Sequence, residues 1–330
     1  MTQPGLQSVT DAPNDDDMAD DVADTAAVTL PDPGETAPVE AKPDPARVTP
    51  LEAREHHVFR SRRSGVPRMR EYLPELWGRR EFVLELARCT LRAQNYLNAF
   101  GQLWLVLNPL LLGCVYYVLA DILSNGKHAH NYFSVLLAGL FLYTFFSSIL
   151  SQSAGSIIGS SRLVLNSRLP RLVLPITQIM IAFMRFLPTL IVFVVVHTLQ
   201  GLSWGVVAFW AIPAFLEVAL FGAGLGFICA TLQVYFRDFS NFLPYVTRIW
   251  LFLSPIMWEA QARIYKPGLG AHLLGLNPLT PMIGSWGDAL VYNVAPNHWW
   301  LLEGAGWSIG AFVVGVVVFI RREREFSVRL

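Results

Sequence analysis

The sequence predicts an all-α integral membrane protein. Six transmembrane helices are expected, with an amphipathic interface helix before them and short re-entrant helices between the fifth and sixth. The 330 residues are 53% hydrophobic and only 15% charged, whereas a typical soluble domain is about 25% charged. The apolar residues gather in long runs, and crossing the hydrocarbon core takes about 20 such residues. Arginines cluster between alternate runs, which is the pattern of loops that stay in the cytoplasm.

Residues 1–50 differ in composition from the rest of the chain. They carry eleven acidic and two basic residues, and they lack the aromatic and branched apolar side chains that offset the entropy of folding. We expect a disordered cytoplasmic tail. Such a tail is either a solvated extension or a binding segment for a basic partner.

Residues 51–101 are predicted to form a basic segment followed by an amphipathic helix. Eight arginines fall within residues 51–80. Beside a membrane segment, attraction to anionic lipid headgroups explains them more simply than nucleic acid does. Over residues 81–101, apolar positions such as Phe82 and Leu86 recur at helical spacing opposite a polar face, which is typical of a helix lying in the cytoplasmic interface.

Six membrane segments follow and make up a transmembrane domain over residues 102–322, with a cytoplasmic tail over residues 323–330. The fifth segment is short and contains Pro244 and Pro255. Proline removes a backbone donor that lipid cannot replace, so we expect a kink or a break there. The predicted segments are residues 103–123, 132–154, 172–199, 206–232, 242–258 and 299–320.

Basic residues set the predicted orientation. Ten arginines lie in residues 51–92, three in the loop after the second segment and four in residues 321–330. The opposite side has only Lys127, Arg263 and Lys266. Because cytoplasmic loops retain Lys and Arg, both termini are placed in the cytoplasm, as an even number of crossings requires.

The outer-side stretch of residues 259–298 mixes apolar residues with proline, glycine and asparagine. It is too interrupted to cross the membrane alone, and loops of this length are uncommon without a role. We expect two short helices that dip partway into the membrane, which requires that they be buried in protein or line a cavity. An exposed loop is the alternative.

The loop over residues 160–175 is the strongest functional candidate. It carries Arg162, Arg168 and Arg171 between two long apolar runs. We interpret it as a short amphipathic turn of helix at the cytoplasmic surface, with the chain re-entering the membrane near Pro170. A loop that only fixes topology would look similar. The functional hypothesis is that mechanical force from a separate ATP-hydrolysing partner enters here.

No catalytic or metal-binding constellation stands out in the sequence. None of the three lysines is followed by Ser or Thr, as a P-loop requires, so ATP with its Mg would be used by another polypeptide. No bound cofactor or metal is expected, because His128 and His130 lack further ligands at suitable spacing. Arg185, the deepest charge in a predicted span, is interpreted either as a pathway residue or as a partner that neutralises Glu217.

Aromatic residues are abundant along the predicted spans. Trp299 and Trp300 fit an interfacial belt. Tyr116 and Tyr143 fit it less well, and aromatic faces with hydroxyl groups suit sugar rings, which present both C–H and O–H surfaces. These tyrosines are therefore candidates for the lining of a pathway.

Several short motifs occur in a defined order. The entry to the first segment reads NYLNAFGQLWLVLNPLL, the second segment LLAGLFLYTFFSS, and the loop gives Asn166 and then LPRLVLP; YFRDF, LSPIMW and LNPLTPMI follow. From about Leu84 onward, roughly three quarters of the chain, the sequence resembles the ABC-2 type permeases that export polysaccharides, such as O-antigen and teichoic-acid exporters. Each motif alone is weak, but their order and spacing on six segments are fairly specific.

The resemblance implies a homodimer of six-helix permeases above a separate ABC ATPase, in the cytoplasmic membrane of a bacterium. It implies that the loop over residues 160–175 is the coupling helix, that residues 259–298 form gate helices, and that the cargo is a polysaccharide or a polyprenyl-linked glycan. Arginine outnumbers lysine 22 to 3, a composition that hints at an actinobacterium, for which a cell-wall galactan is a candidate cargo.

The residue patterns and the resemblance together indicate roles for individual residues. For ATPase coupling these are Arg162, Asn166, Arg168, Pro170 and Arg171. For the translocation pathway and gate they are Trp104, Tyr116, Tyr143, Phe146, Arg237, Asp238, Ser254, Pro255, Asn277 and Pro278. Replacing Arg171 with Glu is expected to reduce export while leaving the permease in the membrane.

Three other classes share some of these features. An ABC-2 permease for a drug or a lipid would have the same six segments without a wide aromatic-lined pore. A membrane-embedded glycosyltransferase or acyltransferase would need a carboxylate pair or a catalytic His, and Asp238 beside Arg237 is not such a pair. A secondary transporter would show an internal repeat, and none is evident in the sequence.

Overall fold

The computed structural model describes residues 69–95, 103–124, 131–166, 169–256 and 275–330, all of which belong to one compact unit, Ser64–Leu330. Every regular element within these ranges is a helix, as predicted. The expected tail over residues 1–50, the first part of the basic segment and Arg168 lie outside the described residues.

Four stretches of the described chain are long and apolar enough to cross a membrane. They correspond to the second, third, fourth and sixth predicted segments, so the chain is a multi-pass integral membrane protein. The stretches are α4 (Tyr132–Gly159), α6 (Val173–Leu199), Val206–Tyr235 with η4 (Val206–Trp210) and α7 (Ala211–Tyr235), and His298–Arg329, which begins with α12 (His298–Arg322).

The first and fifth predicted segments form shorter apolar helices. Within α3 (Trp104–Ser124) the apolar stretch runs from Val106 to Ile122. The other, α8 (Phe239–Leu253), has 15 residues, a length of about 22 Å against a hydrocarbon core of about 30 Å. Helix α8 continues through Pro244 and ends two residues before Pro255, so the break expected from the prolines falls at the second one.

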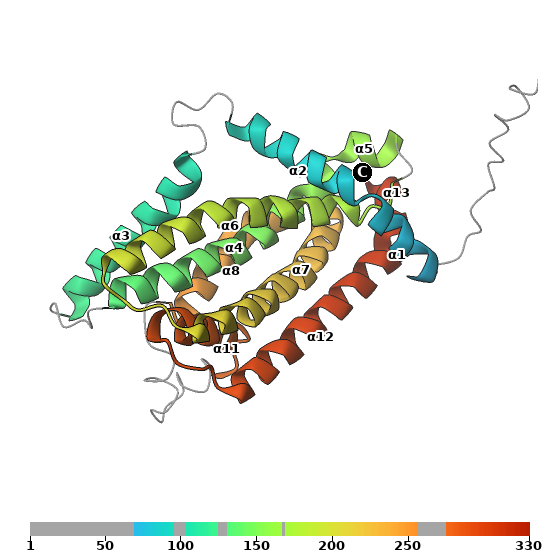
Figure 1. The fold of residues 1–330 in the computed structure, drawn as a ribbon. Helices are drawn as coiled ribbons and strands as arrows, with labels where there is room; N and C mark the ends of the chain where they lie inside the picture. Colours follow the sequence, from blue (N-terminus) through green and yellow to red (C-terminus); the bar gives the residue numbers. More distant parts are fainter. Residues whose placement is uncertain (1–68, 96–102, 125–130, 167–168, 257–274) are drawn as a thin grey trace, which may run out of the picture. The chain divides into compact units, whose positions relative to one another are not determined.

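Helix α4 occupies the centre of the bundle. It contacts α3, α6, α7, α8 and α11 (Leu279–Gly287), and Figure 1 shows it running alongside α6. Seventeen of its 28 residues are buried, among them Phe141, Phe145 and Phe146. The rings of Phe145 and Phe146 stack on Phe215 and Phe221 of α7, with centroids 5.1 and 5.7 Å apart. The core of the protein is therefore built around this helix.

Helices α7 and α12 approach each other through glycines. A Cβ atom on Gly224 would overlap the backbone of Ala311, and one on Gly315 would overlap the carbonyl oxygen of Gly224. Small residues that let two backbones come close are typical of helix pairs in membranes, where burial of apolar surface alone does not drive association.

The outer-side stretch contains a short buried helix. In α11 the buried residues include Met282, Ile283 and Trp286, and the chain continues into a π-helical turn, η5 (Asp288–Tyr292). The Trp286 indole N–H donates to the carbonyl of Ala138 in α4, 3.1 Å away. Burial in protein is the condition under which a short helix is tolerated at membrane depth. Residues 257–274, where part of the expected pair falls, lie outside the described residues.

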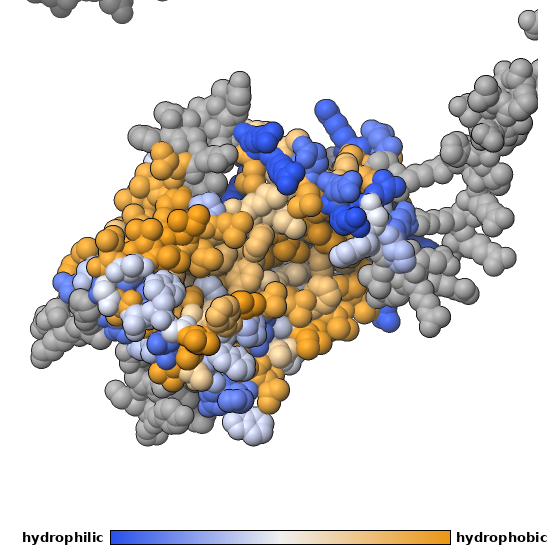
Figure 2. Space-filling view, viewed as in Figure 1, coloured by the Kyte–Doolittle hydropathy of each residue, from blue (hydrophilic) through white to orange (hydrophobic). Residues whose placement is uncertain are grey.

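Two helices precede the bundle, α1 (Met69–Gly78) and α2 (Arg80–Asn95). Helix α2 begins one residue before the predicted interface helix and packs against α6. It buries Val83 and Ala87 and exposes Arg88 and Arg92, the amphipathic pattern that the sequence predicts. Figure 2 shows a broad apolar band, with hydrophilic side chains gathered at the end of the bundle where α1 and the C-terminal helix α13 (Phe326–Arg329) meet.

Candidate functional site

The loop over residues 160–175 folds into a short helix with one inward and one outward face. This helix, α5 (Ser161–Asn166), buries Val164 in an apolar cluster with Ile157, Leu172 and Phe326. Arg162, Leu165 and Asn166, at positions i, i+3 and i+4, are exposed on the opposite side. Two of these three were predicted; Leu165, which is 57% exposed, was missed because an apolar residue in an apolar stretch gives no signal.

The second half of the loop is attached to the C-terminal tail. Pro170 is buried and Arg171 is half-buried. The Arg171 backbone N–H donates to a carboxylate oxygen of Glu323 at 2.8 Å, and its guanidinium donates to the backbone carbonyl of Glu323. Glu323 begins a 3-10 turn, η6 (Glu323–Glu325), that follows α12. Arg171 therefore connects the loop to the end of α12, and its guanidinium is not presented on the α5 face.

Tyr72 of α1 joins the same contact. Its hydroxyl accepts a hydrogen bond from the Leu172 backbone N–H at 3.4 Å. Burial raises the pKa of Tyr72 well above its ordinary value, and the neighbouring Glu323 carboxylate raises it further. The hydroxyl thus keeps its proton. We call Tyr72, Arg171 and Glu323 the tail clamp.

The tail packs back onto the end of α7. Tyr235 donates a hydrogen bond from its hydroxyl to the Glu325 carboxylate, and the Arg329 guanidinium lies 4.2 Å from the centroid of the Tyr235 ring. Phe326 is fully buried against Phe319. Sequence reasoning missed the clamp and these contacts, although two glutamates in an otherwise basic tail are a signal that the tail has cationic partners.

Two of the predicted pathway motifs meet at one point. Asn277 donates from its side-chain amide to the carbonyl of Leu253 (3.0 Å) and to the Ser254 hydroxyl (3.2 Å). Its carbonyl oxygen accepts from the Trp250 indole (2.8 Å) and from the Leu279 backbone N–H (3.1 Å). Asn277 therefore provides hydrogen-bond partners for backbone groups at the end of α8 and at the start of α11. Pro255 and Pro278 flank this network, buried and half-buried.

The aromatic candidates face the interior of this chain to different degrees. Tyr143 is buried, and its hydroxyl donates to the carbonyl of Thr247. Phe146 is fully buried, with its ring edge-on to Trp250 at 5.3 Å. Tyr116 is half-buried and meets Phe252 edge-on at 6.4 Å. In this chain all three pack between helices.

Arg237 and Asp238 lie at the turn between α7 and α8, and both are exposed. The turn is held by Gln233, whose amide donates to the Arg237 carbonyl at 2.7 Å and to the Ser240 hydroxyl at 3.2 Å. The YFRDF motif therefore occupies a surface turn at the end of α7.

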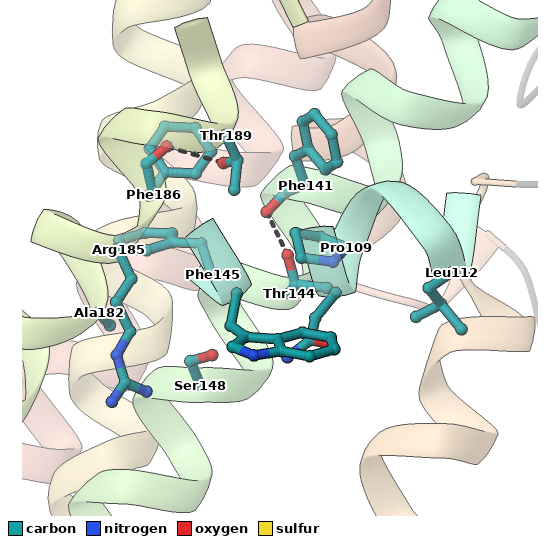
Figure 3. Close-up of a pocket in the computed structure, with 12 residues that line it drawn as sticks. Pro109, Leu112, Phe141, Thr144, Phe145, Ser148, Ala182, Arg185, Phe186 and Thr189 are labelled. Carbon is teal, nitrogen blue, oxygen red and sulfur yellow. Dashed lines mark hydrogen bonds between the residues drawn. The ribbon is translucent and has the colours of Figure 1, made fainter. Parts of the chain in front are cut away.

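A cavity of about 580 Å³ opens between α3, α4 and α6. Figure 3 shows Arg185 and Ser148 on its wall, with Pro109 of α3 across from them. Trp104, one of the predicted pathway residues, also lines it. Each helix contributes residues spaced three or four apart, so each presents one face to the cavity. The lining comprises Trp104, Asn108, Pro109, Leu112, Phe141, Thr144, Phe145, Ser148, Ala182, Arg185, Phe186 and Thr189.

Of the two interpretations of Arg185, the pairing with Glu217 is wrong. The Arg185 guanidinium donates to the side-chain oxygen of Gln94 in α2, while Glu217 lies on α7 against Gly304 of α12. One carboxylate oxygen of Glu217 has no hydrogen-bond partner among the described residues. The two charges share no helix interface, because Arg185 faces the α3–α4 side of α6 and Glu217 faces α12.

The helical bundle with its four long apolar helices defines a multi-pass membrane protein, and comparison with known proteins identifies the family. The model of the ABC-2 type transporter family matches residues 85–285. The chain belongs to this family. Members are transmembrane permease subunits without a catalytic domain, and in ABC transporters ATP hydrolysis belongs to the partner ATPase.

Individual relatives cover most of the described bundle. The O-antigen export system permease protein RfbA of Klebsiella pneumoniae is 28% identical over 231 residues, which are 70% of this chain and 87% of that protein. The protein of the same name from Myxococcus xanthus is 24% identical over 257 residues, 77% of this chain and 96% of that protein.

Proposed function

We propose that this chain is the permease subunit of an ATP-driven transporter that exports a polysaccharide, carried on a polyprenyl lipid, across the bacterial cytoplasmic membrane. The observation that carries the proposal is the similarity to O-antigen export permeases, which extends over 70–77% of the chain and most of each relative. A cell-wall galactan is the proposed cargo.

The coupling site is α5 together with the tail clamp. Arg162, Leu165 and Asn166 form an outward face that the described part of the chain leaves uncovered. An ATPase subunit bound to this face would displace α5. The hydrogen bonds between Arg171 and Glu323 would carry that displacement to α12, because they join the loop to residues 152 positions further along the chain. The permease would change conformation because the ATPase makes different contacts with it in the two states of the ATPase.

The proposed assembly is a homodimer in which α3 and α8 complete six crossings per chain. Helix α3 leaves Leu111, Val115 and Ile122 exposed, and α8 leaves Phe242, Tyr245 and Ile249 exposed, so both helices have apolar faces for lipid or for a second copy. A glycan needs such a route because its hydroxyl groups lose their water in hydrocarbon. The gate is proposed where Asn277 joins α8 to α11.

Depletion of the protein in its native host tests the proposal. Lipid-linked glycans would be extracted from the cytoplasmic side, sized and analysed for their sugars. Long lipid-linked polysaccharide should accumulate inside while the mature polymer outside is lost, and the sugar composition then names the cargo. Normal lipid-linked glycans alongside a build-up of a drug or a free lipid would overturn the proposal in favour of a small-molecule permease.

A further inference from the structure

The cavity between α3, α4 and α6 contains a cation that has no counter-charge among the residues the structure describes. Among the described residues, Arg185 forms no ion pair, and its guanidinium donates a hydrogen bond to the neutral side chain of Gln94. Its Nε atom is buried and has no hydrogen-bond partner in the described part of the chain. A guanidinium carries five N–H donors, so most of its hydrogen-bonding capacity is unused.

The position of Arg185 makes this arrangement costly. It stands twelve residues after the first residue of α6, a depth of about 18 Å along the helix axis. Ionisable residues at such depth are expensive to place in lipid, and they face cavities or carry function. Gln94 holds the side chain in position, but a neutral amide does not balance its charge. An anion in the cavity would.

The remaining polar groups define what the cavity would bind. The hydroxyls of Thr144 and Thr189 donate to the carbonyls of Phe141 and Phe186 within their own helices, so their protons are not available to a ligand. Figure 3 shows both of these hydrogen bonds. Ser148 and Asn108 line the wall as further donors, and Asn108 is exposed. The donors therefore suit an oxyanion, with guanidinium as the group that binds phosphate oxygens best.

The rest of the wall is apolar and aromatic. Leu112, Phe145 and Phe186 stand beside the polar groups, and the cavity volume of about 580 Å³ falls within the range of roughly 300–1,000 Å³ typical of ligand sites. It is much larger than one phosphate group. A ligand that fills the cavity therefore combines a phosphate or diphosphate with adjacent hydrocarbon. Helix α2, which supplies Gln94, is the amphipathic helix at the entry to the bundle.

We propose that this cavity binds the phosphate or diphosphate that joins a lipid to its glycan, with Arg185 as the anion-binding residue, Ser148 and Asn108 as further donors, and Gln94 as the residue that positions the guanidinium. The inference rests on the proposed function, since it names a subsite for the lipid-linked cargo. It places the charged junction of the substrate at the α3–α6 side of the permease, beside α2.

Binding to the purified full-length permease tests the site without any export assay. The probes are polyprenyl diphosphate, the corresponding polyprenol without phosphate, and phosphatidylglycerol, each titrated by microscale thermophoresis. The variant is Arg185→Gln. The matched control is Arg88→Gln, which removes an equal charge from the exposed surface of α2, where Arg88 lies 3.7 Å from Glu85.

We expect wild type and Arg88→Gln to bind polyprenyl diphosphate equally and Arg185→Gln to bind it about tenfold more weakly or worse. Polyprenol should bind weakly to all three proteins. Arg185→Lys, which keeps the charge but loses the planar fork, should fall between them. A thermal unfolding profile like that of wild type shows that Arg185→Gln is folded; if it is not, Ser148→Ala and Asn108→Ala carry the same test with smaller losses.

The outcomes separate this inference from the proposed function. Equal binding of polyprenyl diphosphate by wild type and all cavity variants overturns the site, even if depletion shows glycan accumulation. If phosphatidylglycerol binds as tightly as polyprenyl diphosphate and its binding also depends on Arg185, the assignment to the cargo is overturned. The site would then hold an ordinary lipid headgroup. Arg185-dependent binding of the diphosphate alone supports the site, even in a host where depletion leaves the glycans unchanged.

Discussion

Asn277 shows how much structure one residue can hold at membrane depth. Its side chain makes four hydrogen bonds, to two groups at the end of α8, to Trp250 and to the start of α11. Replacing it with Ala removes the partners of a partly buried indole N–H and of the Leu253 carbonyl. We expect Asn277→Ala to destabilise the protein by about 2–4 kcal/mol, measured as a lower midpoint of thermal unfolding in detergent.

A smaller change at the same network is its control. Ser254→Ala removes one partner of Asn277 and leaves the other three contacts in place, so a loss of about 1 kcal/mol is expected. If both variants unfold at the temperature of the wild type, the hydrogen bonds of Asn277 do not hold α8 to α11. They would then not stabilise the proposed gate.

The sequence identified individual residues that lie in motifs, but it did not predict which distant residues are in contact. It singled out Asn277, Ser254 and Arg171 without their partners. It also offered Glu217 as one possible partner of Arg185, because both residues are charged and deeply placed. Which face of a helix a residue occupies depends on packing between helices, and a nearly uniform apolar helix such as α7 has no periodic pattern that reveals it.

At the scale of the element, α5 is the part of the chain whose outward face has a testable partner. Leu165→Asp changes a side chain that is 57% exposed, so the unfolding temperature should stay within about 1–2 °C of the wild type. Loss of a central apolar contact weakens an interface by about 2 kcal/mol, or roughly 30-fold. We expect the co-expressed ATPase to be lost from affinity purifications of the permease.

The control for α5 lies at the same end of the protein. Val328 in α13 is 87% exposed, and Val328→Asp introduces the same charge outside the α5 face. It should retain the ATPase. If Leu165→Asp retains the ATPase as well, α5 does not dock the partner.

The existence of the helices was predicted better than their surroundings. The runs at residues 132–154, 172–199 and 299–320 fall within α4, within one residue of α6, and within α12, because about 20 apolar residues have few other stable conformations. The sequence also placed a turn of helix at α5. It did not show that α4 is enclosed while α3 is largely exposed, since both helices are similarly apolar.

At the scale of the whole molecule, the tail clamp joins α1, the loop over residues 160–175 and the end of α12. Glu323→Ala removes the acceptor for the Arg171 backbone N–H, and it leaves the Tyr72 hydroxyl beside an apolar methyl group. We expect a loss of about 1–3 kcal/mol in stability and reduced export at an unchanged level of permease in the membrane. Thermal unfolding and the amount of surface polymer measure the two effects.

The neighbouring Arg324 supplies the comparison. It is exposed, so Arg324→Ala should keep the stability and export of the wild type. If the Glu323→Ala variant exports polymer as fast as the Arg324→Ala variant, movement of α5 is not transmitted through the tail clamp. Helix α5 would then act on the bundle through Val164 and its apolar neighbours.

The enclosure of α4 also bears on how the protein is made. Helix α4 leaves the ribosome before α6, α7, α8 and α11, which cover it in the finished bundle. Until α7 is inserted, buried polar side chains such as Ser153 face lipid or the insertion machinery instead of protein. A chain stopped after α6 therefore presents an unfinished membrane surface, and we expect quality-control proteases to remove it while chains that reach α12 persist.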